Sequence, residues 1–401
     1  MLAGRLLAAT GTGATSVCSA LFLVRSVGLA PAEVGTGLLL ANVAGFAALP
    51  LVGRCADRWG GRAVAAVLGL VAAAALPWFS AVDSLIVFAA VEGVVNVALL
   101  GMMVGVRTLV AHLFEGRTRV RYQAYQRSAT NLGMAVGALV AVLPLQADTR
   151  DAYIAVFYAN AVAVAVAAAC VWFGPRPQWQ GTAGRPSRWA AFSDSSYLVM
   201  TVLCGVLVAR ASMLTTAIPL WIGMDGDLPR GLAGVLLAVN TGLCVLLQVR
   251  LAAKADTLPG ARRSMWRGGY VFVLAFLAIG VAPAASAVPA TGLLLLGVVA
   301  FSVAEMLTSA ASWTLSFELA DPAAHGQYQA VYSLGTGLGG VVGPPLATGV
   351  AIGLGMLGWV VAALFFLVCS ASAAYLIPWA ARRAPSAATA HADTSTTGSR
   401  K

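Results

Sequence analysis

The chain consists of long apolar runs separated by short polar turns. A helix that crosses the roughly 30 Å hydrocarbon core of a bilayer needs about 20 mostly apolar residues, because each residue advances it by about 1.5 Å. Twelve runs approach this length, and they lie at 6–27, 34–52, 63–82, 84–106, 122–145, 152–173, 197–222, 232–253, 265–283, 291–317, 328–354 and 356–377. The sequence therefore predicts an all-α membrane protein with twelve transmembrane helices.

Composition agrees with a membrane protein. Of the 401 residues, 60% are hydrophobic and 10% are charged, whereas soluble domains carry about 25% charged residues. The net charge of +10 comes from arginines scattered through short turns, so we expect no nucleic-acid partner. The six cysteines show no paired spacing, and we expect no disulfide framework, no metal site and no cofactor. The first apolar run has no clean signal-peptide cleavage site, and we interpret it as a retained helix.

Basic residues in alternate loops predict the orientation, because lysine and arginine are enriched on the cytoplasmic side. If the N-terminus is cytoplasmic, that side carries Arg5, Arg54, Arg58, Arg62, Arg117, Arg119, Arg121, Arg176, Arg185, Arg188, Lys254, Arg262, Arg263, Arg382 and Arg383. The opposite side carries the basic residues Arg25, Arg150 and Arg230 and the acidic residues Glu33, Asp83, Asp148, Asp151, Asp225 and Asp227. We therefore expect a plasma-membrane protein with both termini in the cytoplasm.

Three pairs of segments indicate that the two halves of the chain repeat each other. Residues 38–42 (LLLAN) resemble 236–240 (LLAVN), and Phe88 with Glu92 resembles Phe301 with Glu305. The third pair is Tyr122-Gln123-Ala124, followed by Gly133 and Gly137, and Tyr328-Gln329-Ala330, followed by Gly339 and Gly343. Each pair lies six helices apart in the same order, as expected of a duplicated membrane protein. We expect six-helix bundles at 1–174 and 197–380, a cytoplasmic linker at 175–196 and a disordered tail at 381–401.

The turn after the second apolar run contains a glycine-rich charged motif, Gly53-Arg54-Cys55-Ala56-Asp57-Arg58-Trp59-Gly60-Gly61-Arg62. The glycines permit a tight turn and close helix approach, and the Asp57 carboxylate suits a helix N-terminus. The motif resembles the G-x-x-x-D-R-x-G-R-R signature of the major facilitator superfamily, with Gly61 in place of a basic residue. The resemblance implies two six-helix bundles related by pseudo-two-fold symmetry. The plainer alternative is a simple basic turn on the cytoplasmic side.

The same resemblance implies that this motif is a conformational latch, which holds the two halves in one state by contacting the start of helix 11, here His325-Gly326-Gln327. Its members are Gly53, Asp57, Arg58, Gly60 and Arg62, and we expect Arg107 and Arg127 to join the Asp57 network. The matching turn at 250–263 keeps Lys254, Asp256, Arg262 and Arg263 without the glycine spacing. It implies a weaker second latch.

Glycines in the fifth and eleventh apolar runs are spaced for close helix contact. Gly133 and Gly137 resemble the G-x-x-x-G-P element of drug/proton antiporters, with Ala138 in place of the proline, while Gly339, Gly343 and Pro344 keep the pattern in the eleventh run. Small residues four apart let helix backbones approach. We assign these residues to helix packing, and the resemblance places the chain near the antiporter branch.

Three ionisable residues lie inside apolar runs: Glu92, Arg210 and Glu305. Such groups are costly in a bilayer unless they face a partner or a cavity, and the family resemblance implies that helices 1, 4, 7 and 10 line a central cavity. We expect Arg210 to pair with Glu305 and Glu92 to bind and release a proton. A static charge pair is the alternative. Amides that could bind a solute, or instead join helices, are Asn42, Asn96, Asn131, Asn240 and Gln248.

Together these features predict a secondary transporter rather than an enzyme, since no catalytic or nucleotide-binding motif appears in its required context. We expect proton-coupled export of a drug-like or amphipathic compound by alternating access, with the protein acting as a monomer in the lipid bilayer. The alternatives are uptake of a sugar-like metabolite by symport and a non-transporting membrane receptor on the same fold.

Overall fold

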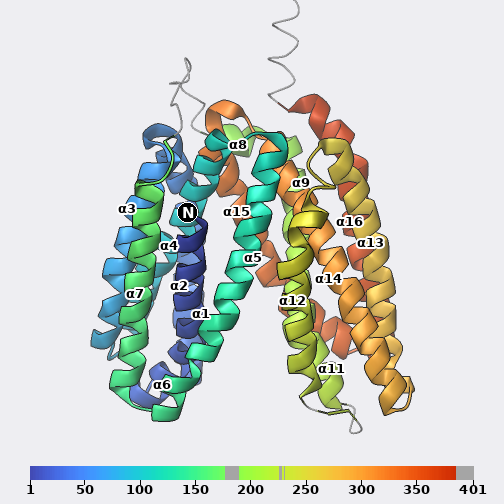
Figure 1. Cartoon of the computed structure of the whole chain (residues 1–401), viewed down its shortest axis with the longest axis horizontal. Coiled ribbons are helices and arrows are strands. Elements are labelled where there is room, and N and C mark those ends of the chain that lie inside the picture. Colours follow the sequence, from blue (N-terminus) through green and yellow to red (C-terminus); the bar gives the residue numbers. More distant parts are fainter. Residues whose placement is uncertain (177–188, 225–227, 230, 385–401) are drawn as a thin grey trace, which may run out of the picture. The chain divides into compact units, whose positions relative to one another are not determined.

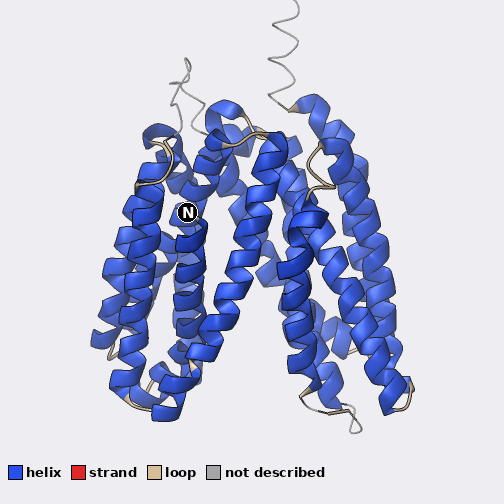
Figure 2. Ribbon diagram, in the orientation of Figure 1, coloured by secondary structure: helices blue, strands red, loops and turns tan. Residues whose placement is uncertain are grey.

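The computed structural model of the chain describes residues 1–176, 189–224, 228–229 and 231–384. All regular structure in these ranges is helical, and no strand occurs in them (Figure 2). Several sequence predictions lie outside the described residues: most of the linker, the tail beyond residue 384, and the topology residues Arg185, Arg188, Asp225, Asp227 and Arg230.

Eleven helices in the described ranges are long and apolar enough to cross a membrane. They are Leu2–Val27, Ala32–Trp59, Gly61–Ala81, Leu85–Leu113, Gly116–Ala147, Arg150–Trp172, Ser195–Met224, Leu232–Ala252, Leu258–Ala284, Ala287–Glu318 and Met356–Arg383. The remaining expected run is the helix α15 (His325–Pro345) with the π-helical segment η7 (Leu346–Ile352). This helix is less apolar than the other eleven because it contains many glycines and begins with a polar turn.

The chain divides into two compact units. Unit 1 contains Met1–Glu115, Tyr125–Arg188 and Ala323–Ala330. Its helices are α1 (Leu2–Leu21), η1 (Phe22–Val27), α2 (Pro31–Trp59), α3 (Gly61–Ala75), η2 (Leu76–Ala81), α4 (Leu85–Leu113), most of α5 (Gly116–Val140), α6 (Val142–Ala147) and α7 (Arg150–Trp172) (Figure 1). Its core contains stacked aromatic rings, with the Phe79 and Phe157 centroids 4.4 Å apart and Phe22 edge-on to Phe157 at 5.3 Å. Such pairs add stability beyond the area they bury.

Unit 2 contains Gly116–Ala124, Trp189–Pro322 and Val331–Lys401. Its helices are α8 (Ala190–Ser193), α9 (Ser195–Val206), η3 (Leu207–Ala209), α10 (Arg210–Ser212), η4 (Met213–Ala217), α11 (Ile218–Met224), α12 (Leu232–Ala252), α13 (Leu258–Val281), η5 (Ala282–Ala284), α14 (Ala287–Glu318), most of α15, η7 and α16 (Met356–Arg383), with η6 (Pro322–Ala324) at its edge. Phe272, Phe276, Phe301 and Phe366 pack ring against ring in its core. The first turns of α5 thus belong to unit 2, and the first turns of α15 belong to unit 1.

The predicted seventh helix is interrupted. Between α9 and α11 the backbone changes to a 3-10 turn at η3, returns to α-helix at α10, and widens to a π-helix at η4. Short 3-10 and π segments inside a helix displace backbone carbonyls and often mark functional positions. Arg210 begins the short α-helical piece between the two irregular segments.

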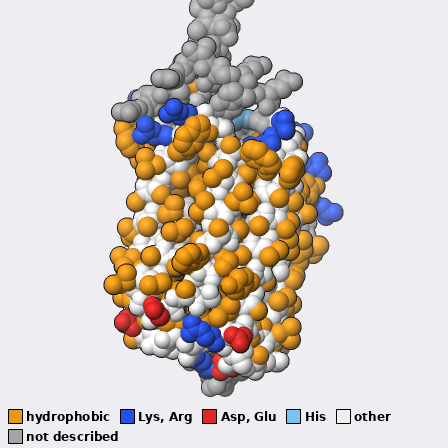
Figure 3. All heavy atoms as spheres, turned by 90° about the vertical axis from the view of Figure 1, so that its left-hand side faces the viewer, with side chains coloured by type: hydrophobic (Ala, Val, Ile, Leu, Met, Phe, Trp, Pro, Cys, Tyr) orange, Lys and Arg blue, Asp and Glu red, His pale blue; other side chains and the backbone are white. Residues whose placement is uncertain are grey.

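Side-chain chemistry on the face formed by unit 1 changes from end to end. Figure 3 shows hydrophobic side chains over the middle of this face, with most of the Lys and Arg side chains at one end and the acidic side chains at the other. Large apolar side chains such as Leu139 and Leu143 are exposed. Apolar cover of this extent is typical of a surface in contact with lipid.

Candidate functional site

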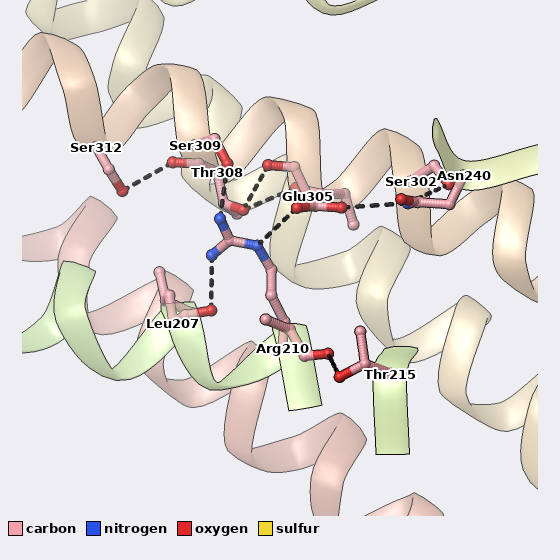
Figure 4. Close-up of polar contacts among 11 residues, drawn as sticks. Leu207, Arg210, Thr215, Asn240, Ser302, Glu305, Thr308, Ser309 and Ser312 are labelled. Carbon is pink, nitrogen blue, oxygen red and sulfur yellow. Dashed lines mark hydrogen bonds and ion pairs between the residues drawn. The ribbon is translucent and has the colours of Figure 1, made fainter. Parts of the chain in front are cut away.

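The candidate site in unit 2 is centred on two buried charged side chains, Arg210 and Glu305 (Figure 4). The Arg210 Nε lies 3.8 Å from the Glu305 Oε1, and the two side chains are only 8% and 9% exposed. Arg210 Nη2 donates a hydrogen bond of 2.7 Å to the Ser309 Oγ. A buried charge pair is tolerated when further hydrogen bonds satisfy its remaining polar atoms. The structure therefore brings together the two residues that the sequence predicts to pair.

Arg210 is held by the local break in its own helix. Its Nη1 donates a hydrogen bond of 2.6 Å to the backbone carbonyl of Leu207, in the preceding 3-10 turn. The side chain thus bends back along its own helix while its Nη2 reaches α14 (Figure 4). The 3-10 turn η3 thus supplies a carbonyl that helps to hold the guanidinium in place.

Glu305 is shared between the arginine and an amide. Asn240 of α12 donates from its Nδ2 to the Glu305 Oε2 at 3.2 Å and to the Ser302 Oγ at 2.9 Å. The second carboxylate oxygen is therefore satisfied by a neutral donor. Three helical elements of unit 2, α10, α12 and α14, each supply a polar side chain to this cluster.

Glu92 has a different environment in unit 1. It lies on α4, is half-buried, and makes no hydrogen bond or ion pair within the described part of the chain. Phe88 and Asn96 lie one turn before and after it on the same face. Both contact α2, since a Cβ at Gly37 would lie 2.4 Å from the Phe88 ring and a Cβ at Gly45 2.5 Å from the Asn96 Oδ1. Glu92 thus lies on a face of α4 that packs near α2.

Three of the amides that could bind a solute or join helices form hydrogen bonds between helices. Asn96 Nδ2 donates to the Asn42 Oδ1 at 3.1 Å between α4 and α2, and Asn240 joins α12 to α14. Gln248 is buried, and its Nε2 has no hydrogen-bond partner among the described residues. Helix-to-helix bonding therefore accounts for Asn42, Asn96 and Asn240 in this structure.

The Asp57 carboxylate binds the beginning of α15 within unit 1. It accepts hydrogen bonds from the backbone N–H groups of Gly326, at 2.5 Å, and Gln327, at 3.0 Å. Free N–H groups and a partial positive charge make a helix N-terminus a favourable place for a carboxylate. A Cβ at Gly53 would lie 2.6 Å from the Gly326 carbonyl oxygen, so the two backbones approach too closely for a side chain there.

The other predicted latch residues have separate contacts. Arg58 lies over the Trp59 ring at 5.9 Å, and Arg62 lies over Trp172 at 4.8 Å. Gly60 ends α2 with a positive φ of 85°, which glycine adopts without strain. Arg107 and Arg127 lie near enough to Arg5 for their charges to interact. Their participation in the Asp57 network stays a prediction.

A second set of charged contacts lies in unit 2, at the beginning of α5. Arg117 forms an ion pair with Asp256, in the turn that matches the Asp57 turn. Arg119 lies 3.7 Å from Glu318 and over the Phe317 ring at 5.1 Å. From the sequence, both arginines are expected only as basic residues of a cytoplasmic turn. The repeat carries a signal for Arg119, because matching Tyr122 to Tyr328 places Arg119 opposite His325.

The predicted packing glycines lie at close helix contacts. A Cβ at Gly133 would lie 2.6 Å from the Leu6 carbonyl oxygen, and one at Gly137 would lie 2.1 Å from that of Thr10. In unit 2, the corresponding atoms at Gly339 and Gly343 would lie 2.5 Å from the Val208 Cβ and 2.3 Å from the Ser212 Oγ. Pro344 and Pro345 lie where α15 changes into the π-helical η7. Proline cannot donate the regular helical hydrogen bond, so a change of helix type at this point is expected.

A polar cluster at the acidic end of unit 1 joins η1, the residue that follows α6, and α7. Arg25 forms an ion pair of 2.7 Å with Asp148, and the Tyr153 hydroxyl donates to the other carboxylate oxygen at 2.6 Å. These contacts, the Tyr153 hydrogen bond foremost, lower the pKa of Asp148. Arg25 therefore has a specific ion-pair partner, Asp148, which the sequence alone did not predict.

Comparison with known proteins agrees with this architecture. Residues 1–344 match the family described as Major Facilitator Superfamily. No curated protein matches the chain at a significant level.

Solved structures of similar fold come from several transporters. A bacterial homologue of the iron transporter ferroportin, in an outward-facing state, is 13% identical with a TM-score of 0.73, over 94% of this chain and 98% of that chain. The E. coli fucose:proton symporter is 12% identical with a TM-score of 0.71, over 94% and 97%. The human organic anion transporter MFSD10 is 15% identical with a TM-score of 0.60, over 95% and 97%. At these identities the likeness concerns the fold.

Proposed function

Because the chain belongs to the Major Facilitator Superfamily, and is thus a multi-pass membrane transporter of a small molecule rather than an enzyme, we propose that it exports a drug-like or amphipathic compound in exchange for protons. The observation that carries the proposal is the buried pair of Arg210 and Glu305 inside apolar helices. A charged group is retained there at a cost that a structural helix avoids. A proton-coupled transporter needs such groups because proton binding must change the charge at its centre.

Glu92 supports proton coupling from the other unit. Its carboxyl group is half-buried inside an apolar span and has no polar partner within the described part of the chain, and an ionisable group in such a place is a candidate functional residue. We assign Glu92 the role of proton carrier. Arg210 and Glu305 bind substrate or respond to it, with Arg210 fixed by its bonds to Leu207 and Ser309.

The charged contacts at the basic ends of the helices support alternating access. In our proposal both termini lie in the cytoplasm of a plasma-membrane protein, and the bundles comprise residues 1–174 and 197–380. The contacts of Asp57 with α15 and of Arg117 with Asp256 then lie on the cytoplasmic side, and we assign them the roles of first and second latch. The protein works as a monomer.

Uptake by symport is the second candidate. It is favoured by structural likeness to the fucose:proton symporter and to the xylose:proton symporter XylE, at TM-scores of 0.71 and 0.67. The buried cluster of Arg210, Glu305, Asn240 and Ser302 also offers hydrogen-bonding groups suited to a polar solute. The direction of proton movement on substrate addition separates the two candidates.

The deciding experiment uses proteoliposomes containing a pH-sensitive dye. Tetraphenylphosphonium, ethidium, fucose, xylose, an aromatic carboxylate and Fe²⁺ are added in turn to wild type, Glu92→Gln and the control Glu115→Gln, which changes an exposed glutamate outside the spans. We expect proton movement opposite to a lipophilic compound, lost in Glu92→Gln and kept in the control. Co-movement with a sugar would establish symport. Wild-type flux without any proton movement would contradict proton coupling.

A further inference from the structure

The outer face of α13 carries two arginines and two aromatic rings near the beginning of the helix. Their spacing of three and four residues places them on one side of the helix, and they are Arg263, Trp266, Arg267 and Tyr270. Both arginines and Tyr270 are exposed, and the Trp266 and Tyr270 rings stack with their centroids 5.9 Å apart. Leu274, further along the same side, is exposed as well. This side of α13 therefore changes from charged to aromatic to aliphatic along its length.

The last turn of α16 brings two more arginines to the same end of unit 2. The helices α13 and α16 are in contact, since a Cβ at Gly269 would lie 3.0 Å from the Ser370 Cβ. They run antiparallel, so that α13 begins at the end of the unit where α16 finishes (Figure 1). The last turn of α16 contains Arg382 and Arg383. Two adjacent helices thus present their basic ends side by side.

The arginines at this end of α13 and α16 have no acidic partner within the described part of the chain. There are five of them, all exposed, and we call them the arginine patch: Arg262, Arg263, Arg267, Arg382 and Arg383. Neither α13 nor α16 contains an acidic residue. No member of the patch forms a hydrogen bond or an ion pair with another described residue, and Arg383 lies over the Trp379 ring at 5.0 Å. Asp256, which precedes α13, is paired with Arg117.

The matching helices of unit 1 carry less charge. The repeat pairs the third and sixth spans with the ninth and twelfth, and therefore α3 and α7 with α13 and α16. The helix α3 contains one arginine, Arg62, whose guanidinium lies over the Trp172 ring of α7 at 4.8 Å. The last turn of α7 contains no basic residue. A few basic residues are enough to orient a helix pair, so topology alone does not account for the arginine patch.

Arg267 lies further along its helix than a topology signal requires. The span that contains α13 has 27 residues and is about 40 Å long, which exceeds the roughly 30 Å of the hydrocarbon core. With the excess shared between the two ends, the first turn of α13 lies outside the core, whereas Arg267 in the third turn lies where the helix enters it. An exposed arginine at this depth is costly unless its guanidinium extends back to the headgroups and finds a partner there.

We propose that the arginine patch binds the headgroup of an anionic phospholipid, with the lipid phosphate between Arg263 and Arg267. A guanidinium donates paired hydrogen bonds to phosphate oxygens, and basic pockets between transmembrane helices bind anionic headgroups. Two arginines four residues apart on a helix repel each other, and an anion between them removes this cost. The inference concerns the surface in contact with lipid, and it does not depend on the solute or on proton coupling.

The side chains around the two arginines fit the rest of such a lipid. Tryptophan and tyrosine favour the level of the headgroups, so the stack of Trp266 on Tyr270 borders the headgroup, and Leu274 continues the face where the acyl chains begin. Arg382 and Arg383 add positive charge from α16. This charge repels the cationic group of a zwitterionic headgroup, so the patch selects a lipid with a net negative charge.

The test measures lipid binding and needs no transported compound. The full chain, purified in detergent, is titrated with phosphatidylglycerol or phosphatidylcholine of identical acyl chains, and bound lipid is measured by native mass spectrometry. We compare wild type, Arg263→Gln with Arg267→Gln, and the control Arg250→Gln with Lys254→Gln. The control also removes two exposed positive charges four residues apart, at the end of α12 in the same unit. The Tm of each chain without lipid verifies that it is folded.

We expect wild type to bind phosphatidylglycerol roughly fivefold more tightly than phosphatidylcholine, or better, because a basic residue near an anionic headgroup strengthens binding by about this factor. The patch variant loses two such residues, so its affinity for phosphatidylglycerol should fall by about tenfold or more, while the control stays within about twofold of wild type. Equal affinity for the two lipids, or equal losses in the two variants, would overturn the inference. Inorganic phosphate that raises the Tm as much as phosphatidylglycerol does would also overturn it, because the patch would then be a site for a free anion.

Discussion

The carboxylate of Asp57 accepts a hydrogen bond from the backbone N–H of Gln327, 3.0 Å away and 270 residues later in the chain. Asp57 accepts a second hydrogen bond from the neighbouring N–H of Gly326. Both of these hydrogen bonds are therefore made with backbone N–H groups at the N-terminus of a helix. This explains how a short charged turn can hold a helix that carries glycine and glutamine at its start.

Replacement of Asp57 by asparagine tests the charge in this contact. Asn keeps one acceptor oxygen but loses the attraction to the helix N-terminus, which is worth about 1 kcal/mol. We expect Asp57→Asn to lower the free energy of unfolding by about that amount, measured by SDS titration in mixed micelles. Asp83→Asn, an exposed aspartate in another turn, is the control. Equal stability of the two variants would argue against a charge-dependent contact.

Gly53 and Gly35 offer a comparison within one helix. A Cβ at Gly53 meets the Gly326 carbonyl at 2.6 Å, whereas a Cβ at Gly35 meets nothing within 4 Å. We expect Gly53→Ala to cost roughly 1–3 kcal/mol through overpacking and Gly35→Ala to be neutral or stabilising by up to about 1 kcal/mol. Thermal unfolding in detergent measures both. A tolerated Gly53→Ala would show that the two backbones can separate without loss.

Asp148 makes stability depend on pH at the acidic end of unit 1. The Tyr153 hydroxyl and Arg25 lower the pKa of Asp148 in the folded chain. A lowered folded-state pKa stabilises the protein above the ordinary aspartate range, and this contribution is lost as the pH falls through the folded-state pKa. We expect the Tm of wild type to fall more steeply toward pH 3 than that of Asp148→Asn. Tyr153→Phe should shift the wild-type loss to higher pH, and parallel curves for all three would contradict the assignment.

Much of this architecture is readable from the sequence, because apolar length and charge placement are local properties. The twelve apolar runs correspond to the observed helices, and the buried residues Arg210 and Glu305 stand out as charges in apolar segments. The family resemblance implied a contact between the Asp57 turn and 325–327, and the structure has hydrogen bonds there. The antiporter branch is not established by the comparisons, which show the family and the fold.

Other features depend on tertiary contacts and left no local signal. The 3-10 and π segments around Arg210 occur in an ordinary apolar sequence, LVARASMLTTA, that any regular helix could contain. The placement of Arg58 and Arg62 over tryptophan rings depends on side-chain packing. The beginning of α5 belongs to unit 2 because its arginines find Asp256 and Glu318 there, and neither partner is near them in sequence.

A double-mutant cycle at Arg210 and Glu305 separates their mutual interaction from their individual burial. Removing Arg210 alone, as Arg210→Met, takes away the cation of a buried ion pair and leaves the Glu305 carboxylate buried, and breaking a buried pair typically costs about 3–5 kcal/mol. Adding Glu305→Gln removes the uncompensated charge while Asn240 keeps a hydrogen-bonding partner. We therefore expect the double variant to be more stable than Arg210→Met, with a coupling energy of about 1–3 kcal/mol by SDS titration. If the stability losses of the two single variants add up to that of the double variant, the 3.8 Å separation of Nε and Oε1 is too long to couple the two side chains. The Glu305 carboxylate would then be stabilised by its hydrogen bonds rather than by Arg210.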